Sequence, residues 1–105
     1  MSEVLKSHKE LILYALAKAV DARCSIIYVG YHGDAIKMLS RYYSSIVALI
    51  NAASPYLSNV EELLRKAGKA WEVFGGEDET NLGGAARVLD EVFREVINEV
   101  KEVIR

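Results

Sequence analysis

The chain has 105 residues, a length that fits one domain with a single modest hydrophobic core. Hydrophobic residues make up 51% of it and charged residues 27%, a balance that excludes an intrinsically disordered chain. The formal net charge of -2 removes the simplest case for non-specific DNA binding, which needs a strongly basic surface. One cysteine excludes a disulfide framework within the chain. These totals predict one helical domain over residues 1–105.

The sequence predicts no membrane span and no secretory signal. Charged residues interrupt every apolar run before it reaches the ~18 residues that a spanning helix needs. The N-terminus lacks a basic region followed by an apolar run and a cleavage site. We therefore expect a cytoplasmic protein. Glutamine is absent and Glu, Lys, Arg and Val are common, a composition typical of a thermophile's protein.

A first helix is predicted over residues 2–29. Apolar residues recur at three- and four-residue spacing from Leu5 to Val20, which is the period of an amphipathic helix. The end of this segment has a second interpretation, because residues 25–29 are rich in β-branched and aromatic side chains and would suit a short strand. A strand needs a pairing partner and the rest of the sequence offers a poor one, so continued helix is favoured.

A second helix is predicted over residues 34–53, with Asp34 as its N-cap and Pro55 beyond its end. Its polar residues fall on one thin stripe, and the remainder of its circumference is apolar or aromatic. A helix of that kind must be covered on several sides. Because a short chain has limited cover to offer, the pattern suggests a partner chain.

A third helix is predicted over residues 58–74. Ser58 and Glu61 have the spacing of a capping box, and Gly75-Gly76 supplies a glycine C-cap. A fourth helix is predicted over residues 81–105, capped by Thr80 or Asn81. Four helices with short connections predict an all-α, antiparallel four-helix bundle. Small residues on the last two helices are expected to let helices approach closely: Gly68, Gly83, Gly84, Ala85 and Ala86.

Aromatic and apolar residues gather where the first helix ends and the second begins. Tyrosine is enriched at protein interfaces because it combines a large apolar body with a polar tip. Ordinary packing at the edge of the bundle is the alternative interpretation. The residues predicted to contact a partner are Tyr28, Tyr31, Met38, Leu39, Tyr42 and Tyr43.

Two small groups of basic residues offer a second kind of surface. If the faces that carry them adjoin, they form a positive patch beside the tyrosines, suited to phosphate contact and base stacking. A solvated helix face is the alternative. The residues predicted for nucleic-acid contact are Lys37, Arg41, Arg65, Lys66 and Lys69.

Motifs for catalysis, metal binding or cofactor binding are missing from the sequence. His32 sits in a glycine-flanked turn beside Asp34, but nothing at recognisable spacing offers a nucleophile. The acidic segment at residues 77–79 lacks the alternating spacing of a calcium loop. No cluster of His, Cys, Asp and Glu has zinc-site spacing. We therefore expect a protein that is not an enzyme, with no cofactor and no metal.

One segment slightly resembles a known family. Gly33-Asp34-Ala35-Ile36, followed by Arg41-Tyr42-Tyr43, looks like the second helix of HEPN domains, small helical bundles of defence systems. The resemblance covers about one helix. The family's defining arginine and histidine pair is absent, because no histidine follows His32, so the resemblance implies no nuclease activity.

The expected function is that of a non-catalytic helical interaction module. It would self-associate as a homo-oligomer through its first two helices, or serve as an accessory subunit of a larger complex. The alternative is a nucleic-acid-binding small subunit of a CRISPR/HEPN-like defence assembly or a replication assembly.

Overall fold

The computed structural model describes residues 2–29, 35–75 and 81–105. These residues form the helices α1 (Ser2–Val29), α2 (Ala35–Ala53), α3 (Val60–Phe74) and α4 (Leu82–Ile104), and the short 3-10 helix η2 (Ser54–Tyr56). The described residues contain no strand. The predicted antiparallel four-helix bundle is confirmed. None of the helices in these ranges is long and apolar enough to cross a membrane.

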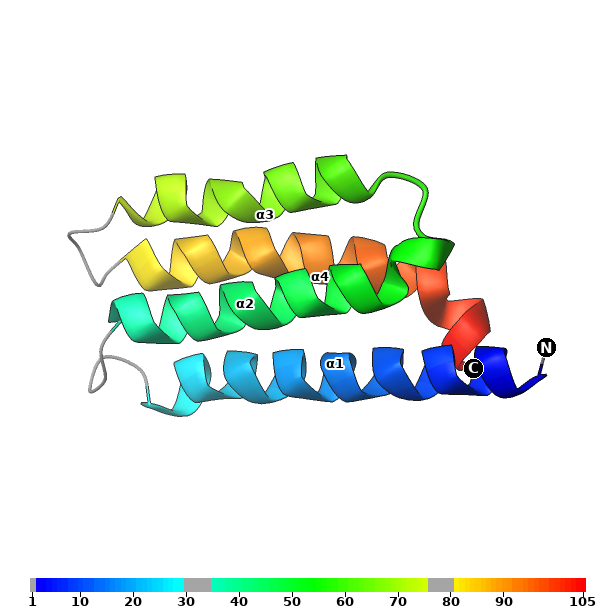
Figure 1. Ribbon diagram of the computed structural model, residues 1–105. Helices are drawn as coiled ribbons and strands as arrows, with labels where there is room; N and C mark the ends of the chain where they lie inside the picture. The colour runs from blue at the N-terminus through cyan, green and yellow to red at the C-terminus, as the bar shows by residue number, and fades with distance from the viewer. Residues whose placement is uncertain (1, 30–34, 76–80) are drawn as a thin grey trace.

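The helices run alternately up and down, with α2 and α4 between α1 and α3 (Figure 1). α2 packs against each of the other three helices, whereas α1 packs mainly against α2 and has little contact with α4. The Cα trace measures 48 × 25 × 16 Å along its principal axes. α1 is therefore an edge helix, and much of its surface lies outside the bundle.

Residues 25–29 continue α1, so the short strand predicted as an alternative is wrong. Ile26 is 7% exposed and extends a series of buried residues spaced three and four apart along the helix. That series matches the helical period and packs α1 on α2. A strand would break it and would leave its own backbone groups unpaired. The buried series is Ile12, Ala15, Ala19, Ala22 and Ile26.

Most of the apolar circumference of α2 is covered within the chain itself, although Ile36 is 51% exposed. Its largest buried side chains, Tyr42 and Ile46 among them, lie at or below 2% exposure. α1, α3 and α4 supply the cover, because all three pack against α2. Most of the cover that the sequence suggests for this helix thus comes from within the chain. The buried residues of α2 are Ala35, Leu39, Tyr42, Ile46, Leu49, Ile50 and Ala53.

The ends of α3 confirm one capping prediction and correct another. Gly75 is left-handed (φ 71°), and its N–H donates to Trp71 O at 3.1 Å, as the glycine C-cap requires. The N-cap is Asn59, whose side chain accepts from the Glu62 N–H at 3.2 Å. Ser58 is not the cap that its sequence spacing predicts, because it hydrogen bonds to Glu99 of α4 instead.

The other predicted caps have mixed outcomes. Asn81 is the N-cap residue of α4 by position, but its side chain makes no capping bond and instead donates to Phe74 O at 3.3 Å. It thereby ties the start of α4 to the end of α3. Asp34, Gly76 and Thr80 lie outside the described residues.

Of the three glycines within the described helices, only Gly84 lies where two helices approach closely. A Cβ at Gly84 would lie 3.3 Å from a methyl carbon of Val73, a tight contact between α4 and α3. A Cβ at Gly68 or Gly83 would meet nothing within 4 Å. The prediction that Gly68 and Gly83 permit close packing is therefore wrong.

Replacing Asn59 tests the corrected cap. We expect Asn59→Ala to lower the free energy of unfolding by about 1 kcal/mol, because it removes the acceptor for an orphan backbone N–H. Ser58→Ala, the matched control, removes only the exposed hydroxyl bond to Glu99 and should cost less. Urea denaturation of both variants measures the difference. A larger loss for Ser58→Ala would restore Ser58 as the cap.

Gly68→Ala is expected to stabilise the protein by roughly 0.5–1 kcal/mol. Alanine restricts the unfolded backbone and favours the helix, and open space surrounds the new methyl group. Gly84→Ala is the control, since Val73 would have to move to admit it, and it should gain less. Thermal melting compares the two; equal gains would contradict the packing difference.

Candidate protein interface

α1 carries two apolar series of residues, and α2 covers one of them. The second series lies about 140° around the helix from the buried one, as follows from a rotation of about 100° per residue. Its spacing of four, three, four and three residues is that of a helix-packing seam. We call this second series the α1 stripe; it consists of Leu13, Ala17, Val20, Cys24 and Ile27.

The α1 stripe is largely open to solvent. Leu13, Val20 and Ile27 are 39%, 44% and 63% exposed. Ala17 is also exposed, and Cys24 is half-buried. Single exposed apolar residues are ordinary, but an aligned row of them on one helix marks a surface that favours burial.

Beside the α1 stripe, a groove with a volume of about 320 Å³ separates α1 from α4. Val20, Cys24 and Ile27 line it on the α1 side, and Phe93 lines it on the α4 side with Arg94. A further hollow continues along α4 past Phe93 to Ile97. We call the two hollows together the α1/α4 groove. The apolar surface thus extends from one helix onto its neighbour.

A polar network joins the two walls of the α1/α4 groove. Arg23 of α1 donates two hydrogen bonds to Asp90 of α4, from Nε to Oδ1 at 2.9 Å and from Nη2 to Oδ2 at 3.2 Å. Tyr42 of α2 donates its hydroxyl to Asp90 Oδ1 at 2.6 Å. Both charged side chains are about three-quarters buried, with 27% and 24% exposure. The network therefore fixes three helices at one level.

The network raises the pKa values of Arg23 and Tyr42, so both side chains keep the protons that they donate to Asp90. The hydrogen bond to Asp90 raises the pKa of Arg23, which keeps the guanidinium charged. Burial, and then the bond to Asp90, raise the pKa of the Tyr42 hydroxyl well above its usual range. Tyr42 therefore remains a neutral donor wherever the protein is folded near neutral pH.

The residues predicted for the interface are divided between the core and its margin. Leu39 and Tyr42 are buried in the chain's own core, at 0% and 2% exposure. Met38 and Tyr43 are half-buried and pack against that core, Tyr43 with its ring edge-on to Trp71 at 5.8 Å. Tyr31 and the side chain of Tyr28 lie outside the described part of the chain.

Sequence reasoning missed the α1 stripe, although its signal is present in the printed sequence. The apolar residues of α1 fit two separate series, and one series is enough to bury a helix against one neighbour. Two series on an edge helix leave one without cover. The missing information was that α1 lies at the edge, which depends on how all four helices pack.

The predicted nucleic-acid residues do not gather on one face. Arg41 of α2 reaches α1, where it pairs with Asp21 at 2.7 Å. Lys66 of α3 reaches α4 and pairs with Glu95 at 2.9 Å. Arg65 pairs with Glu62 on its own helix, and Lys69 is exposed on α3. Lys37 is exposed on α2.

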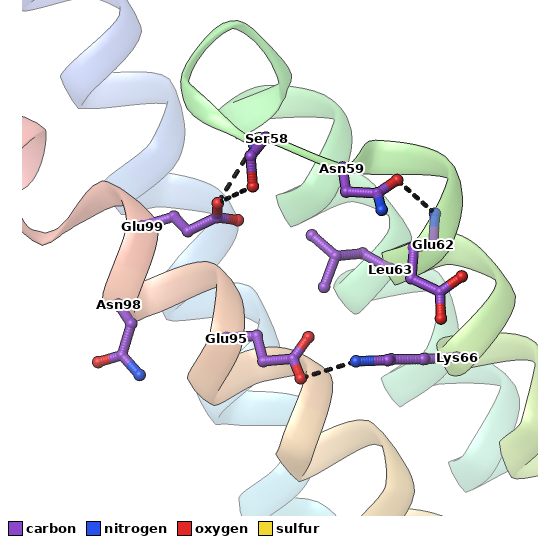
Figure 2. A pocket seen from close by; sticks show the side chains of 8 residues that line it. All are labelled: Ser58, Asn59, Glu62, Leu63, Lys66, Glu95, Asn98 and Glu99. Atoms are coloured by element: carbon purple, nitrogen blue, oxygen red, sulfur yellow. Dashed lines mark hydrogen bonds and ion pairs between the residues drawn. The ribbon is translucent and has the colours of Figure 1, made fainter.

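A second hollow, of about 360 Å³, lies between the start of α3 and α4, and Figure 2 shows its polar lining. Glu99 accepts from both the backbone and the hydroxyl of Ser58, while Lys66 spans the gap to Glu95 (Figure 2). The Asn59 side chain turns away to cap α3. These side chains join the α3 side of the hollow to α4, so their role is to hold the two helices together.

Groups suited to metal chemistry are not clustered in the described ranges, where no set of three His, Cys, Asp or Glu residues gathers. His8 lies 2.8 Å from the Tyr56 hydroxyl through Nδ1, with the rings edge-on, and so links α1 to η2. His32 and residues 77–79 lie outside the described residues.

Comparison of the chain with protein-family models, with curated proteins and with solved structures gives no match.

Tyr42→Phe is expected to lower the free energy of unfolding by roughly 1.5 kcal/mol near pH 7, because a hydroxyl bond to a carboxylate is lost. The folded state raises the pKa of Tyr42 above its unfolded value of about 10. The contribution of the Tyr42 hydroxyl bond to the free energy of unfolding is therefore complete below pH ~10. It is lost as the pH rises further and the hydroxyl ionises. The difference between wild type and variant should shrink in strong alkali.

Urea denaturation of both proteins near neutral pH and above pH ~10 measures this difference. Tyr43→Phe is the control, since the ring of Tyr43 packs on Trp71 and its hydroxyl makes no bond to Asp90. It should cost less near neutral pH. A difference between wild type and Tyr42→Phe that is constant with pH would contradict the assigned bond.

Proposed function

We propose that the protein is a non-catalytic helical interaction module that docks on another helical surface through the α1 stripe and the α1/α4 groove. The observation that supports this proposal is the row of exposed apolar side chains on an edge helix, from Leu13 to Ile27. The contact surface differs from the one predicted from the tyrosines of α2, because those residues pack within the chain.

Burial of the stripe would release considerable free energy. Removing a large aliphatic side chain from water contributes roughly 1.5–3 kcal/mol when burial is complete. Leu13, Val20 and Ile27 are 39%, 44% and 63% exposed, so a partner has roughly that share of the contribution still to gain. Part of the gain is offset by the lost freedom of two associating molecules.

The pattern of the stripe favours a helix as the docking element. Residues spaced alternately four and three apart form one straight row along α1, and such a row packs into the row of a second helix. From residue 13 to residue 27 the row is roughly 21 Å long at 1.5 Å per residue. The α1/α4 groove beside it offers the lateral contact that helix-in-groove recognition uses.

The nucleic-acid alternative has less support. Arg65 and Lys66 each have a carboxylate partner within the chain, which reduces the positive potential they present. Arg41 and Lys66 also reach toward different neighbouring helices, α1 and α4. Binding to single-stranded RNA or DNA that weakens steeply with salt would support this alternative.

Photo-crosslinking tests the proposed docking surface. We expect a benzophenone amino acid at position 17, in the centre of the α1 stripe, to form crosslinks to protein when the source cells are irradiated. The same group in place of Lys69, on the exposed side of α3, is the matched control. Gel electrophoresis with detection of the chain reports the covalent species.

The proposal requires the crosslinks from position 17 to exceed those from position 69 severalfold. A second substitution, Val20→Lys, should reduce the crosslinks from position 17, since it places a charge within the stripe. Equal yields from the two positions, or no crosslinks from position 17, would overturn the proposed function.

A further inference from the structure

We infer that the occupant of this surface is a second copy of the same chain, related by a two-fold axis that runs along the bundle, so that α1 of each copy packs on α4 of the other. The inference rests on the proposed function, and adds to it the partner and the arrangement. The observation that selects this partner and this arrangement is the charge beside the apolar surface, which is acidic on one side and basic on the other.

The α1 stripe is bordered by acidic residues on the side away from α4. Arg23 marks the α4 side of α1, because it pairs with Asp90. Glu10 and Asp21 lie roughly 140–160° around the helix from Arg23. They are eleven positions apart, which is about three helical turns, so they lie on one line along the helix. Both are exposed. Asp21 pairs with Arg41 of α2, but both side chains are more than half exposed, and such pairs contribute little.

A basic row follows the outer side of α4. Arg87, Arg94 and Lys101 are spaced seven residues apart, and all three are exposed. Arg94 lines the α1/α4 groove together with Phe93, which places this row on the same face as the α1 stripe. One face of the molecule therefore has an acidic border on α1 and a basic ridge on α4, with apolar side chains between them.

Two contacts give the register of these rows along the bundle. Arg23 meets Asp90, and Lys9 Nζ donates to Arg105 O at 3.2 Å, as expected for antiparallel α1 and α4 (Figure 1). Counting from these contacts, Asp21 is within about two residues, or roughly 3 Å, of the level of Arg94. Glu10 is within about one turn of Lys101.

A two-fold axis parallel to the helices keeps every residue at its own level and exchanges the two sides of the face. It brings Asp21 of one copy to Arg94 of the other, and Glu10 to Lys101. It also seats each α1 stripe against the Phe93 and Ile97 surface of the facing copy. An axis across the bundle would place α1 on α1 and α4 on α4, and the like charges would repel.

The size of the face is consistent with a reversible dimer. The paired length of α1 and α4, from residue 9 to residue 27, is roughly 28 Å, and two helices side by side are roughly 20 Å wide. Two such faces bury on the order of 1,100 Å², near the lower end of specific interfaces at about 1,200 Å². We therefore expect dissociation in the micromolar range.

Reversing the charges at Glu10 and Lys101 tests the two-fold arrangement. Sedimentation equilibrium measures the dissociation constant of the dimer. Wild type should be a dimer at about 1 mM and dissociate near about 1 µM. Glu10→Lys and Lys101→Glu should each raise the dissociation constant roughly tenfold, and the double variant should return to within about threefold of wild type. Glu72→Lys, at an exposed site on α3, is the control and should change nothing.

The outcomes separate this inference from the proposed function. A monomeric wild type that still crosslinks another protein from position 17 would overturn the inference and leave the proposed function standing. A wild-type dimer in which the double variant remains as weak as the single ones would overturn the two-fold arrangement. Circular dichroism and thermal melting establish that each variant is folded, so that weakened association reports on the interface.

Discussion

The burial of α2 by the other three helices is the constraint on which the rest of the structure depends. A bundle of four helices with α2 at its centre leaves α1 beside α2 and nearly clear of α3 and α4. Asp90 then holds the open side together by accepting bonds from Arg23 and Tyr42. The apolar core and this polar network thus have complementary roles, because the core positions α2 and the network limits how far α1 can separate from α4.

The number, order and approximate bounds of the helices follow from the sequence, because helical period and turn residues are local signals. Gly75 is an example, since a glycine after a helical period predicts a left-handed cap. The Ser58 cap was mispredicted because two adjacent residues, Ser58 and Asn59, are both good caps. The choice between them depends on Glu99, a partner 41 residues away that the local pattern does not contain.

The surface that we propose for docking lies on α1 and α4, whereas the sequence points to the tyrosines around the start of α2. The sequence indicates more apolar surface in the first half of the chain than one small core needs, and the exposed residues of α1 agree with that reasoning. The tyrosines of α2 favour an interface in the sequence, because tyrosine is common at interfaces. Tyr42 and Leu39 are instead core residues, since helix arrangement, which periodicity does not specify, placed α2 in the middle.

The alanines of the buried seam have a consequence for motion. Three of the five residues that pack α1 on α2 are Ala15, Ala19 and Ala22, which allow close approach but bring little side-chain surface to the contact. This seam therefore brings less side-chain surface per residue than the seam of α4, which contains Leu89 and three valines. Amide hydrogens of α1 should therefore exchange with solvent through local opening while the other helices stay protected.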